Sequence, residues 1–391
     1  MKRNIYADNA ATTKLDEVAF NAMKEYMLNE YGNASQPYSF ARTSKKALQK
    51  SREIIANCIN SSADEVFFTS GGTESDNWVI KKFGSTDCKK VIIVSEIEHH
   101  AILNSCDEVK DDLHEIVVLP VDKTGIVDSQ VLINTLEEYH HLNVQILVSV
   151  MIANNEIGTI EPIKKLAAIS HQYGAFFHTD AVQALGHIKV DVQDLDVDFL
   201  SASSHKFNGP KGTGFLFVKK GSPIKSFISG GYQEQGNRAG TENVAAVVGM
   251  SIALQENVRN IELHQQMLLR LENALIQKLQ EYKLIFIRNG TQNHLPGIVN
   301  LSFMRQNGEM ILHRMDLMGC YISTGSACDS VNNQISHVIK AIQVPKEYAE
   351  GTIRISFGKY NTLEDAIDIA AMLKSIINEY WIFRNIKFKP A

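Results

Sequence analysis

Short apolar runs alternate with longer amphipathic stretches through the first half of the chain, and this rhythm constrains the fold more than any other feature. The runs are EVFFTS (65–70), KVIIVS (90–95), VQILVSVM (144–151), AFFHTD (175–180), VDFLSAS (197–203) and GFLFVKK (214–220). Runs of this length predict buried strands, and the stretches between them predict helices. Strands that alternate with helices form a mostly parallel sheet covered by helices. The sequence therefore predicts an α/β fold with such a sheet.

A different pattern follows in the second half of the chain. A long helical stretch runs from about Ala245 to Tyr282, and beyond it lie the strand candidates GIVNLSF (297–303) and GTIRISFG (351–358), with a helix predicted near 308–318. This order no longer alternates strictly between strand and helix. It predicts a second, smaller α+β domain, with the long helix as the bridge.

Charge and cysteine usage exclude several classes of protein. The net charge of −5 argues against a nucleic acid or an anionic membrane as the main partner, so we expect neither. The five cysteines are an odd number and no pair has CxxC spacing, so neither a disulfide framework nor a structural zinc site is expected. The N-terminal MKRNIYADNAATT has no apolar stretch like that of a signal peptide. We therefore expect a cytoplasmic protein.

Two neighbouring strand runs end in residues of opposite charge. Asp180 closes AFFHTD, and Lys206 follows the run 197–203 in SASSHKFNGPKGTG. In parallel sheets, ligands bind beyond the carboxyl ends of the strands. An acid and a lysine placed there suit pyridoxal phosphate, because the lysine can form a Schiff base and the acid can pair with the pyridinium nitrogen. A salt bridge at the sheet edge is the structural alternative.

A phosphate site is predicted where a strand runs through Gly71, Gly72 and Thr73 into a helix. Glycines let the backbone approach an anion, and the start of a helix offers N–H groups and a favourable dipole. Further phosphate candidates are Ser203 and His205, which flank Lys206, and Thr241 in RAGTENV. A glycine turn before a helix is by itself often only a turn.

Other candidates would act on the cofactor ring or on the substrate. His99 or His100, after a strand, could stack on the ring, and Gln183 could reach the ring hydroxyl. Cys328 lies among small and polar residues in STGSACDS, a setting that suits a nucleophilic thiolate, although an incidental loop cysteine is the alternative. Arg354 could clamp a substrate carboxylate, the alternative being a buried ion pair.

Nine motifs in order give the chain a close resemblance to the pyridoxal-phosphate-dependent cysteine desulfurases of the class-V aminotransferase superfamily. They are YADNAATT, TSGGTESDN, IEHHAI, NNEIG, HTDAVQALG, SSHKFNGPKG, QEQGNRAGTEN, STGSACDS and IRISFG. The resemblance spans nearly the whole chain. It implies fold-type I, which we expect as a large cofactor domain at 16–260 and a small domain at 1–15 with 261–391 that carries the cysteine loop.

The resemblance also implies a role for each matching residue. Lys206 would hold the cofactor, His99 would stack on it, and Cys328 would carry the persulfide. The remaining residues would bind the cofactor's ring and phosphate or the substrate carboxylate: Gly72, Thr73, Asn155, Asp180, Gln183, Ser203, His205, Thr241 and Arg354. Thr241 would come from the other subunit of a homodimer. No resident metal is implied, and Cys328 is a candidate transient iron–sulfur ligand.

The implied reaction converts L-cysteine to L-alanine and passes the persulfide sulfur to an acceptor protein. The 14 residues after Cys328, DSVNNQISHVIKAI, resemble the branch with a longer cysteine loop. Ala34, Tyr38 and Asn208 depart from residues common in the family, which favours a specialised role. A transaminase or selenocysteine lyase on the same scaffold, and a catalytically idle scaffold, are the rival hypotheses. The acceptor could serve iron–sulfur cluster assembly, tRNA thiolation or DNA sulfur modification.

Overall fold

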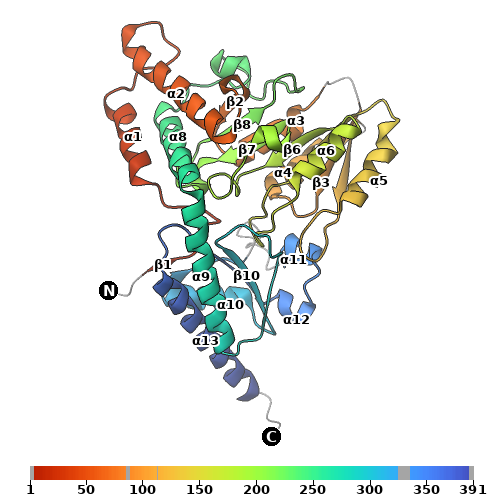
Figure 1. The fold of residues 1–391 in the computed structure, drawn as a ribbon, viewed down its shortest axis with the longest axis vertical. Coiled ribbons are helices and arrows are strands. Elements are labelled where there is room, and N and C mark those ends of the chain that lie inside the picture. The colour runs from red at the N-terminus through yellow and green to blue at the C-terminus, as the bar shows by residue number, and fades with distance from the viewer. Residues whose placement is uncertain (1–3, 85–88, 112, 325–334, 387–391) are drawn as a thin grey trace.

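A seven-stranded sheet forms the centre of the larger part of the molecule (Figure 1). The computed structural model describes residues 4–84, 89–111, 113–324 and 335–386. The strand order is β2 (Val66–Thr69), β8 (Gly214–Val218), β7 (Phe199–Ser203), β6 (Phe176–Asp180), β5 (Gln145–Ser149), β3 (Lys90–Ser95) and β4 (His114–Leu119). Only β8 runs antiparallel to its neighbours. The predicted α/β fold with a mostly parallel sheet is confirmed.

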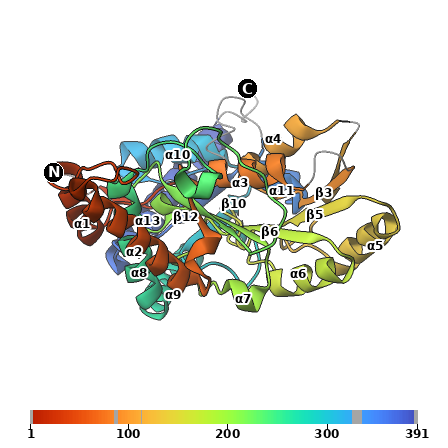
Figure 2. The ribbon, with the colours of Figure 1, turned by 90° about the horizontal axis from the view of Figure 1, so that it is seen from above.

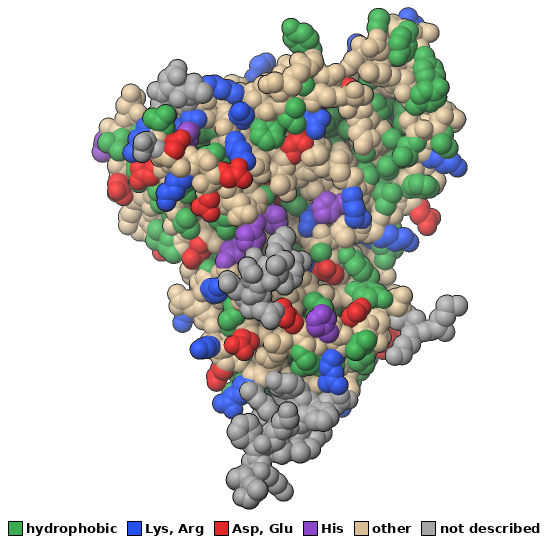
Figure 3. All heavy atoms as spheres, turned by 180° about the vertical axis from the view of Figure 1, so that it is seen from behind, with side chains coloured by type: hydrophobic (Ala, Val, Ile, Leu, Met, Phe, Trp, Pro, Cys, Tyr) green, Lys and Arg blue, Asp and Glu red, His purple; other side chains and the backbone are tan. Residues whose placement is uncertain are grey.

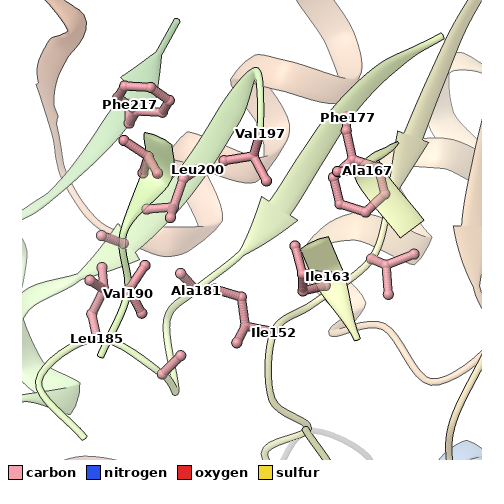
Figure 4. Close-up of a cluster of buried hydrophobic side chains, with 14 of the residues drawn as sticks. Ile152, Ile163, Ala167, Phe177, Ala181, Leu185, Val190, Val197, Leu200 and Phe217 are labelled. Atoms are coloured by element: carbon pink, nitrogen blue, oxygen red, sulfur yellow. The ribbon is translucent and has the colours of Figure 1, made fainter. Parts of the chain in front are cut away.

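Helices cover both faces of this sheet, because successive side chains of each strand point to opposite faces. On one face, Ile92 and Leu147 pack with Trp78 of α3 (Gly72–Lys82) and Ile102 of α4 (His100–Val109). The other face packs against α2 (Arg42–Ile59), α5 (Ser129–His140), α6 (Ile163–Gln172) and α8 (Val244–Arg259). Figure 4 shows part of that second core, in which Phe177, Leu200 and Phe217 of the strands belong to the same buried cluster as Ile163 and Ala167 of α6. Six of the seven strands are thus buried on both faces, as their continuous apolar sequences predict, whereas β4 at the edge is only partly buried.

The long helical stretch predicted between Ala245 and Tyr282 is two helices, so that prediction was wrong in detail. Helix α8 ends at Arg259 and α9 (Ile261–Glu281) begins two residues later. Asn260 between them has φ −113° and ψ 15°, outside helical values. No proline or glycine marks the break in the sequence. Figure 1 shows α9 continuing from α8 toward the smaller part of the molecule.

The smaller part combines both ends of the described chain. Its antiparallel sheet has the order β12 (Thr352–Ser356), β10 (Ile298–Phe303), β9 (Phe286–Arg288), and β1 (Ile5–Tyr6) pairs in parallel with β11 (Cys320–Tyr321). Helices α9, α10 (Gly308–Leu317) and α13 (Leu363–Ile386) pack on it around a separate buried cluster. Figure 2 shows α10, α13 and β12 from above. We propose domain boundaries near residues 16 and 260.

Four shorter or peripheral helices complete the described fold: α1 (Glu17–Leu28), α7 (Val192–Leu195), α11 (His337–Ala341) and α12 (Lys346–Ala349). Val338 and Ile339 of α11 join the core of the larger sheet although they lie in sequence between elements of the smaller domain. This packing brings α11 beside the carboxyl ends of the large sheet's strands. No helix within the described residues has the length and apolar character needed to cross a membrane.

Candidate active site

A cavity of about 290 Å³ lies beyond the carboxyl ends of β5, β6 and β7. Polar side chains from segments far apart in the sequence meet there. Ten of the twelve residues singled out from the sequence line it: Gly72, Thr73, His99, Asn155, Asp180, Gln183, Ser203, His205, Lys206 and Arg354. The topology explains this convergence, since parallel strands deliver their carboxyl ends to one edge of the sheet.

Lys206 reaches the cavity from the turn that follows β7. Its Nζ donates hydrogen bonds to the carbonyl oxygens of Ala10 at 2.5 Å and Ala11 at 3.1 Å. The Thr13 hydroxyl donates to the His205 carbonyl at 2.8 Å, which fixes the N-terminal segment beneath this turn. The lysine amine is therefore held at the cavity wall by backbone carbonyls. A carbonyl cradle positions the amine without neutralising it.

Asp180 stands at the end of β6 and is 6% exposed. Burial raises the pKa of its carboxyl to about 6, while the hydrogen bond from the Val182 N–H and the charge of Lys206 oppose the rise. That N–H donates to Oδ1 at 2.8 Å. A carboxylate so placed would bind a protonated ring nitrogen strongly, because a new positive charge would offset its burial.

Two further buried groups lie near Asp180. His178 receives or donates hydrogen bonds at both ring nitrogens, to Ser149 Oγ at 2.8 Å and Ser201 Oγ at 3.0 Å, and burial lowers its pKa to about 3. Asp76 of α3 also lines the cavity, and burial together with the charge of Asp180 raises its pKa well above the ordinary value. Sequence reasoning missed Asp76, although it follows Thr73 by three residues on the same helix face.

The first turn of α3 forms a close cradle with β7 and the segment after β6. A Cβ at Gly72 would lie 2.5 Å from Val182 Cγ2 and 3.6 Å from Ser203 Cβ, so only glycine fits there. Thr73, Ser203 and His205 line the cavity around this turn. The helix N-terminus and the hydroxyls match what a phosphate group requires. This is the part of the site that fits the phosphate of pyridoxal phosphate.

His99 is the N-cap of α4, and its Nδ1 accepts a hydrogen bond from the Ala101 N–H at 3.1 Å. Burial, followed by the charges of Lys206, His100 and His337, lowers its pKa to about 4. The ring is thus neutral at pH 7 and carries its proton on Nε2. Gln183, which also lines the cavity, donates from Nε2 to the Ala10 carbonyl at 2.9 Å.

Arg354 projects from β12 of the small sheet into the cavity. Its Nη2 lies 2.7 Å from Asp8 Oδ1, and its Nη1 donates to the carbonyl oxygen of Asn155 at 2.9 Å. The side chain is 3% exposed. Both partners hold the guanidinium in one orientation at the edge of the cavity. Sequence reasoning did not single out Asp8.

Two of the predicted site residues do not line this cavity. Thr241 is exposed and lies between the loop after β8 and α8. Cys328 lies outside the described residues, within 325–334. The cavity also contains His100, the alternative to His99 as the stacking ring, and His337 and Glu156, which sequence reasoning left without a role.

Comparison with known proteins places this chain in a family. Residues 5–368 match the family model described as aminotransferase class-V. The chain is 44% identical to the cysteine desulfurase IscS of Dictyoglomus turgidum, over 97% of this chain and 96% of that protein. It is 35% identical to the cysteine desulfurase NifS of Azotobacter vinelandii, over 97% and 95% of the two chains. The chain therefore belongs to the class-V aminotransferase family, and within it to the cysteine desulfurases.

Solved structures agree with this assignment. A NifS-like protein superposes with a TM-score of 0.88 at 33% identity, covering 96% of this chain and all of that one. The structure described as SspA in complex with cysteine superposes with a TM-score of 0.78 at 30% identity, covering 92% of this chain and 100% of that one. Enzymes of this family depend on pyridoxal phosphate.

Proposed function

We propose that this protein is a pyridoxal-phosphate-dependent cysteine desulfurase that forms a persulfide on Cys328. The observation that carries the proposal is the meeting of Lys206, Asp180, the α3 cradle and Arg354 in one cavity. A lysine amine, a buried acid, a phosphate cradle and a carboxylate clamp are the groups that a cofactor-linked amino acid requires. The identity to cysteine desulfurases over 97% of the chain supports the same reaction.

Each cofactor-binding residue has one task in this proposal. Asp180 would hold the proton of the ring nitrogen, Gln183 would bind the ring hydroxyl, and His99 would stack on the ring. Gly72, Thr73, Ser203 and His205 hold the phosphate. Pyridoxal phosphate, when bound, supplies an electron sink for the pair left at the substrate Cα.

The substrate steps fall to Arg354, Asn155 and Lys206. Arg354 and Asn155 bind the carboxylate, which sets the amino group of L-cysteine toward Lys206. The Lys206 amine then removes the Cα proton, a task for which its cradle of carbonyls keeps it oriented. The neutral His99 can donate the proton on Nε2 during product formation. These residues account for the amino-acid end of the reaction.

Cys328 would perform the sulfur transfer. Its thiolate attacks the substrate sulfur, a new S–S bond forms and the C–S bond breaks, leaving the persulfide on the enzyme and alanine as the product. The sulfur then passes to an acceptor protein, which we place in the cytoplasm with this enzyme. Other thiols are poorly suited, because burial raises the pKa of Cys106 and Cys320 to about 12.

We also propose that the enzyme is a homodimer. Large apolar side chains are exposed along the N-terminal helices and the loop before Thr241: Val18, Phe20, Met27, Leu28, Tyr31, Phe40, Ile228 and Tyr232. Figure 3 views the molecule from behind and shows apolar side chains gathered on its upper right edge. This edge corresponds to the upper left of Figure 1, where α1 lies. Such a surface favours association. Thr241 lies near this surface in sequence and outside its own cavity, so a second copy would receive it.

The decisive experiment measures alanine and sulfide released from L-cysteine in the presence of a thiol reductant. The wild type should release the two products in equal amounts. Cys328→Ala should retain bound, yellow cofactor and bind L-cysteine but release no sulfide, whereas Lys206→Ala should lose the covalent link to the cofactor. Cys58→Ala is the matched control, because burial raises the pKa of that half-buried thiol to about 11 and it lies outside the cavity.

Two outcomes would contradict the proposal. Turnover that survives Cys328→Ala would indicate a lyase that cleaves the C–S bond without the cysteine. Amino-group transfer to a keto acid at a rate above sulfide release would indicate a transaminase on the same scaffold.

A further inference from the structure

Three imidazole rings line one wall of the cavity. His99 and His100 begin α4, and His337 begins α11. The ring centroids of His100 and His337 are 4.8 Å apart with an interplanar angle of 68°, and those of His99 and His100 are 6.4 Å apart. Figure 3 shows histidine side chains gathered where the upper part of the molecule meets the lower. Of the three, only His99 has a role in the proposed reaction.

The orientation of His337 is fixed by the backbone. Its Nε2 lies 3.0 Å from the carbonyl oxygen of Glu98, and because a carbonyl only accepts, Nε2 is the donor. The acceptor of the neutral His337 ring is therefore Nδ1. Glu98 is itself immobilised, since its Oε1 accepts hydrogen bonds from Ser95 Oγ and the Met151 N–H, each at 2.9 Å. The ring is thus held by a rigid part of the cavity wall.

Apart from the carboxyl groups of Asp76 and Glu156, the other polar side chains of the cavity are already assigned by the proposed function. Arg354 and Asn155 take the substrate carboxylate, Lys206 takes the amine, and Asp180 and the α3 cradle take the cofactor. The side chain of the bound amino acid needs a separate contact, and His100 and His337 are the paired polar groups left along the wall that begins at His99.

We propose that His100 and His337 form a subsite for the thiol of the amino-acid substrate, with His337 Nδ1 as the acceptor for the S–H group. This inference rests on the proposed function and adds the means by which the enzyme distinguishes cysteine from amino acids without a thiol. A thiol is a weak donor that is largely protonated at neutral pH, so a neutral imidazole is a suitable partner.

The charges around His99 favour its neutral ring. Lys206 and the three imidazoles share one cavity wall, and the charges of Lys206, His100 and His337 each disfavour protonation of His99 after the effect of burial.

The test compares two ligands that differ only in the sulfur. L-cysteine and L-alanine are titrated into the cofactor-loaded full-length protein that carries Cys328→Ala, so that L-cysteine binds without turnover, and binding is followed by the absorption of the cofactor. Adding His337→Gln should weaken the binding of L-cysteine roughly tenfold, which is the value of one hydrogen bond. The affinity for L-alanine should stay within about twofold. Adding His100→Gln should weaken L-cysteine less.

Two further variants separate a thiol subsite from a structural role. His337→Asn places an amide near the position of Nδ1 and should restore most of the preference for L-cysteine. His141→Gln removes an exposed imidazole that does not line the cavity, so it should change the affinity for neither ligand. If His337→Gln weakens the binding of L-cysteine and L-alanine by the same factor, the ratio of their affinities is unchanged and the subsite is overturned. If the Cys328→Ala parent binds neither amino acid, the proposed function falls and the subsite falls with it.

Discussion

The guanidinium of Arg354 and the carboxylate of Asp8 form an ion pair of 2.7 Å between residues that are 346 positions apart in the chain. The pair joins the N-terminal segment, which also cradles Lys206, to β12 of the small sheet. Asp8 therefore orients the residue that would bind the substrate carboxylate. A substrate must share this guanidinium with Asp8, so its carboxylate binds to a group that is already oriented and partly neutralised.

Replacing Arg354 by lysine should weaken the binding of L-cysteine more than it slows the chemical step. A lysine keeps the charge but loses the planar fork that holds Asp8 and the Asn155 carbonyl together. We expect KM to rise roughly tenfold or more, with a smaller change in kcat. Steady-state rates of alanine formation give both constants. An unchanged KM would exclude Arg354 from carboxylate binding.

Gly72→Ala should weaken the binding of the cofactor without unfolding the protein. The new methyl group would lie 2.5 Å from Val182 Cγ2 and would force apart the cradle formed with Ser203. Overpacking of this kind costs about 1–3 kcal/mol, which corresponds to a loss of roughly 5- to 150-fold in pyridoxal phosphate affinity. Fluorescence titration of cofactor-free protein measures it.

The matched control for this prediction is Gly174→Ala. Gly174 has φ +71°, and the methyl group that alanine would add there meets no atom within 4 Å, so the change strains the backbone without crowding a site. It should lower the stability by about 1 kcal/mol and leave the affinity for the cofactor unchanged. If both variants lose affinity alike, the cradle around Gly72 has no special role.

The strands and helices that the sequence predicted correctly are those whose burial is visible in the local pattern of apolar residues. The six named strands were found because they are buried on both faces and read as continuous apolar runs. β4 escaped prediction because its first five residues are half-buried or exposed, at the edge of the sheet. The break between α8 and α9 escaped because Asn260 carries no helix-breaking signal.

The candidate site divides in the same way. Asp180, Lys206 and Gly72 follow strands, so the rule for parallel sheets brings them to one edge. His337 joins the cavity, and Asp8 reaches Arg354 at its edge, only through tertiary contacts with distant segments. A single sequence carries no local signal for such pairings.

Removing the buried imidazole of His178 should make the stability less sensitive to acid. Burial lowers the pKa of this ring from an ordinary 6.5 to about 3. Between these two pH values the unfolded ring binds a proton that the folded ring does not, so stability falls as the pH falls. Asp180 acts in the opposite sense, because its raised pKa of about 6 lets the folded protein hold a proton that unfolding releases.

Between pH 7 and pH 5, the unfolding free energy of His178→Gln should therefore fall by about 2 kcal/mol less than that of the wild type. Urea unfolding of protein purified without cofactor at the two pH values measures the difference. The hydroxyls of Ser149 and Ser201 can still bond to the glutamine amide, which limits the change at pH 7. Parallel losses in the two proteins would show that His178 is not buried in its neutral form.

The buried ion pair between Arg52 and Glu234 should be essential to stability rather than to chemistry. Arg52 donates to both carboxylate oxygens of Glu234, at 2.7 and 2.6 Å, and its guanidinium lies 4.1 Å from the centre of the Phe68 ring. The Glu234 side chain is only 3% exposed, so Arg52→Ala leaves a buried carboxylate whose only other described hydrogen bond comes from the Phe68 N–H. Breaking one side of such a pair costs about 3–5 kcal/mol.

We expect Arg52→Ala to lower the unfolding free energy by an amount in that range, while Arg52→Lys recovers part of it. Arg259→Ala is the control, because its pair with Glu256 is exposed and such pairs contribute about 1 kcal/mol or less. Urea unfolding monitored by circular dichroism compares the three variants. Equal small losses in Arg52→Ala and Arg259→Ala would mean that water reaches Glu234 once Arg52 is gone, and that the loop before Thr241 is held by its backbone contacts instead.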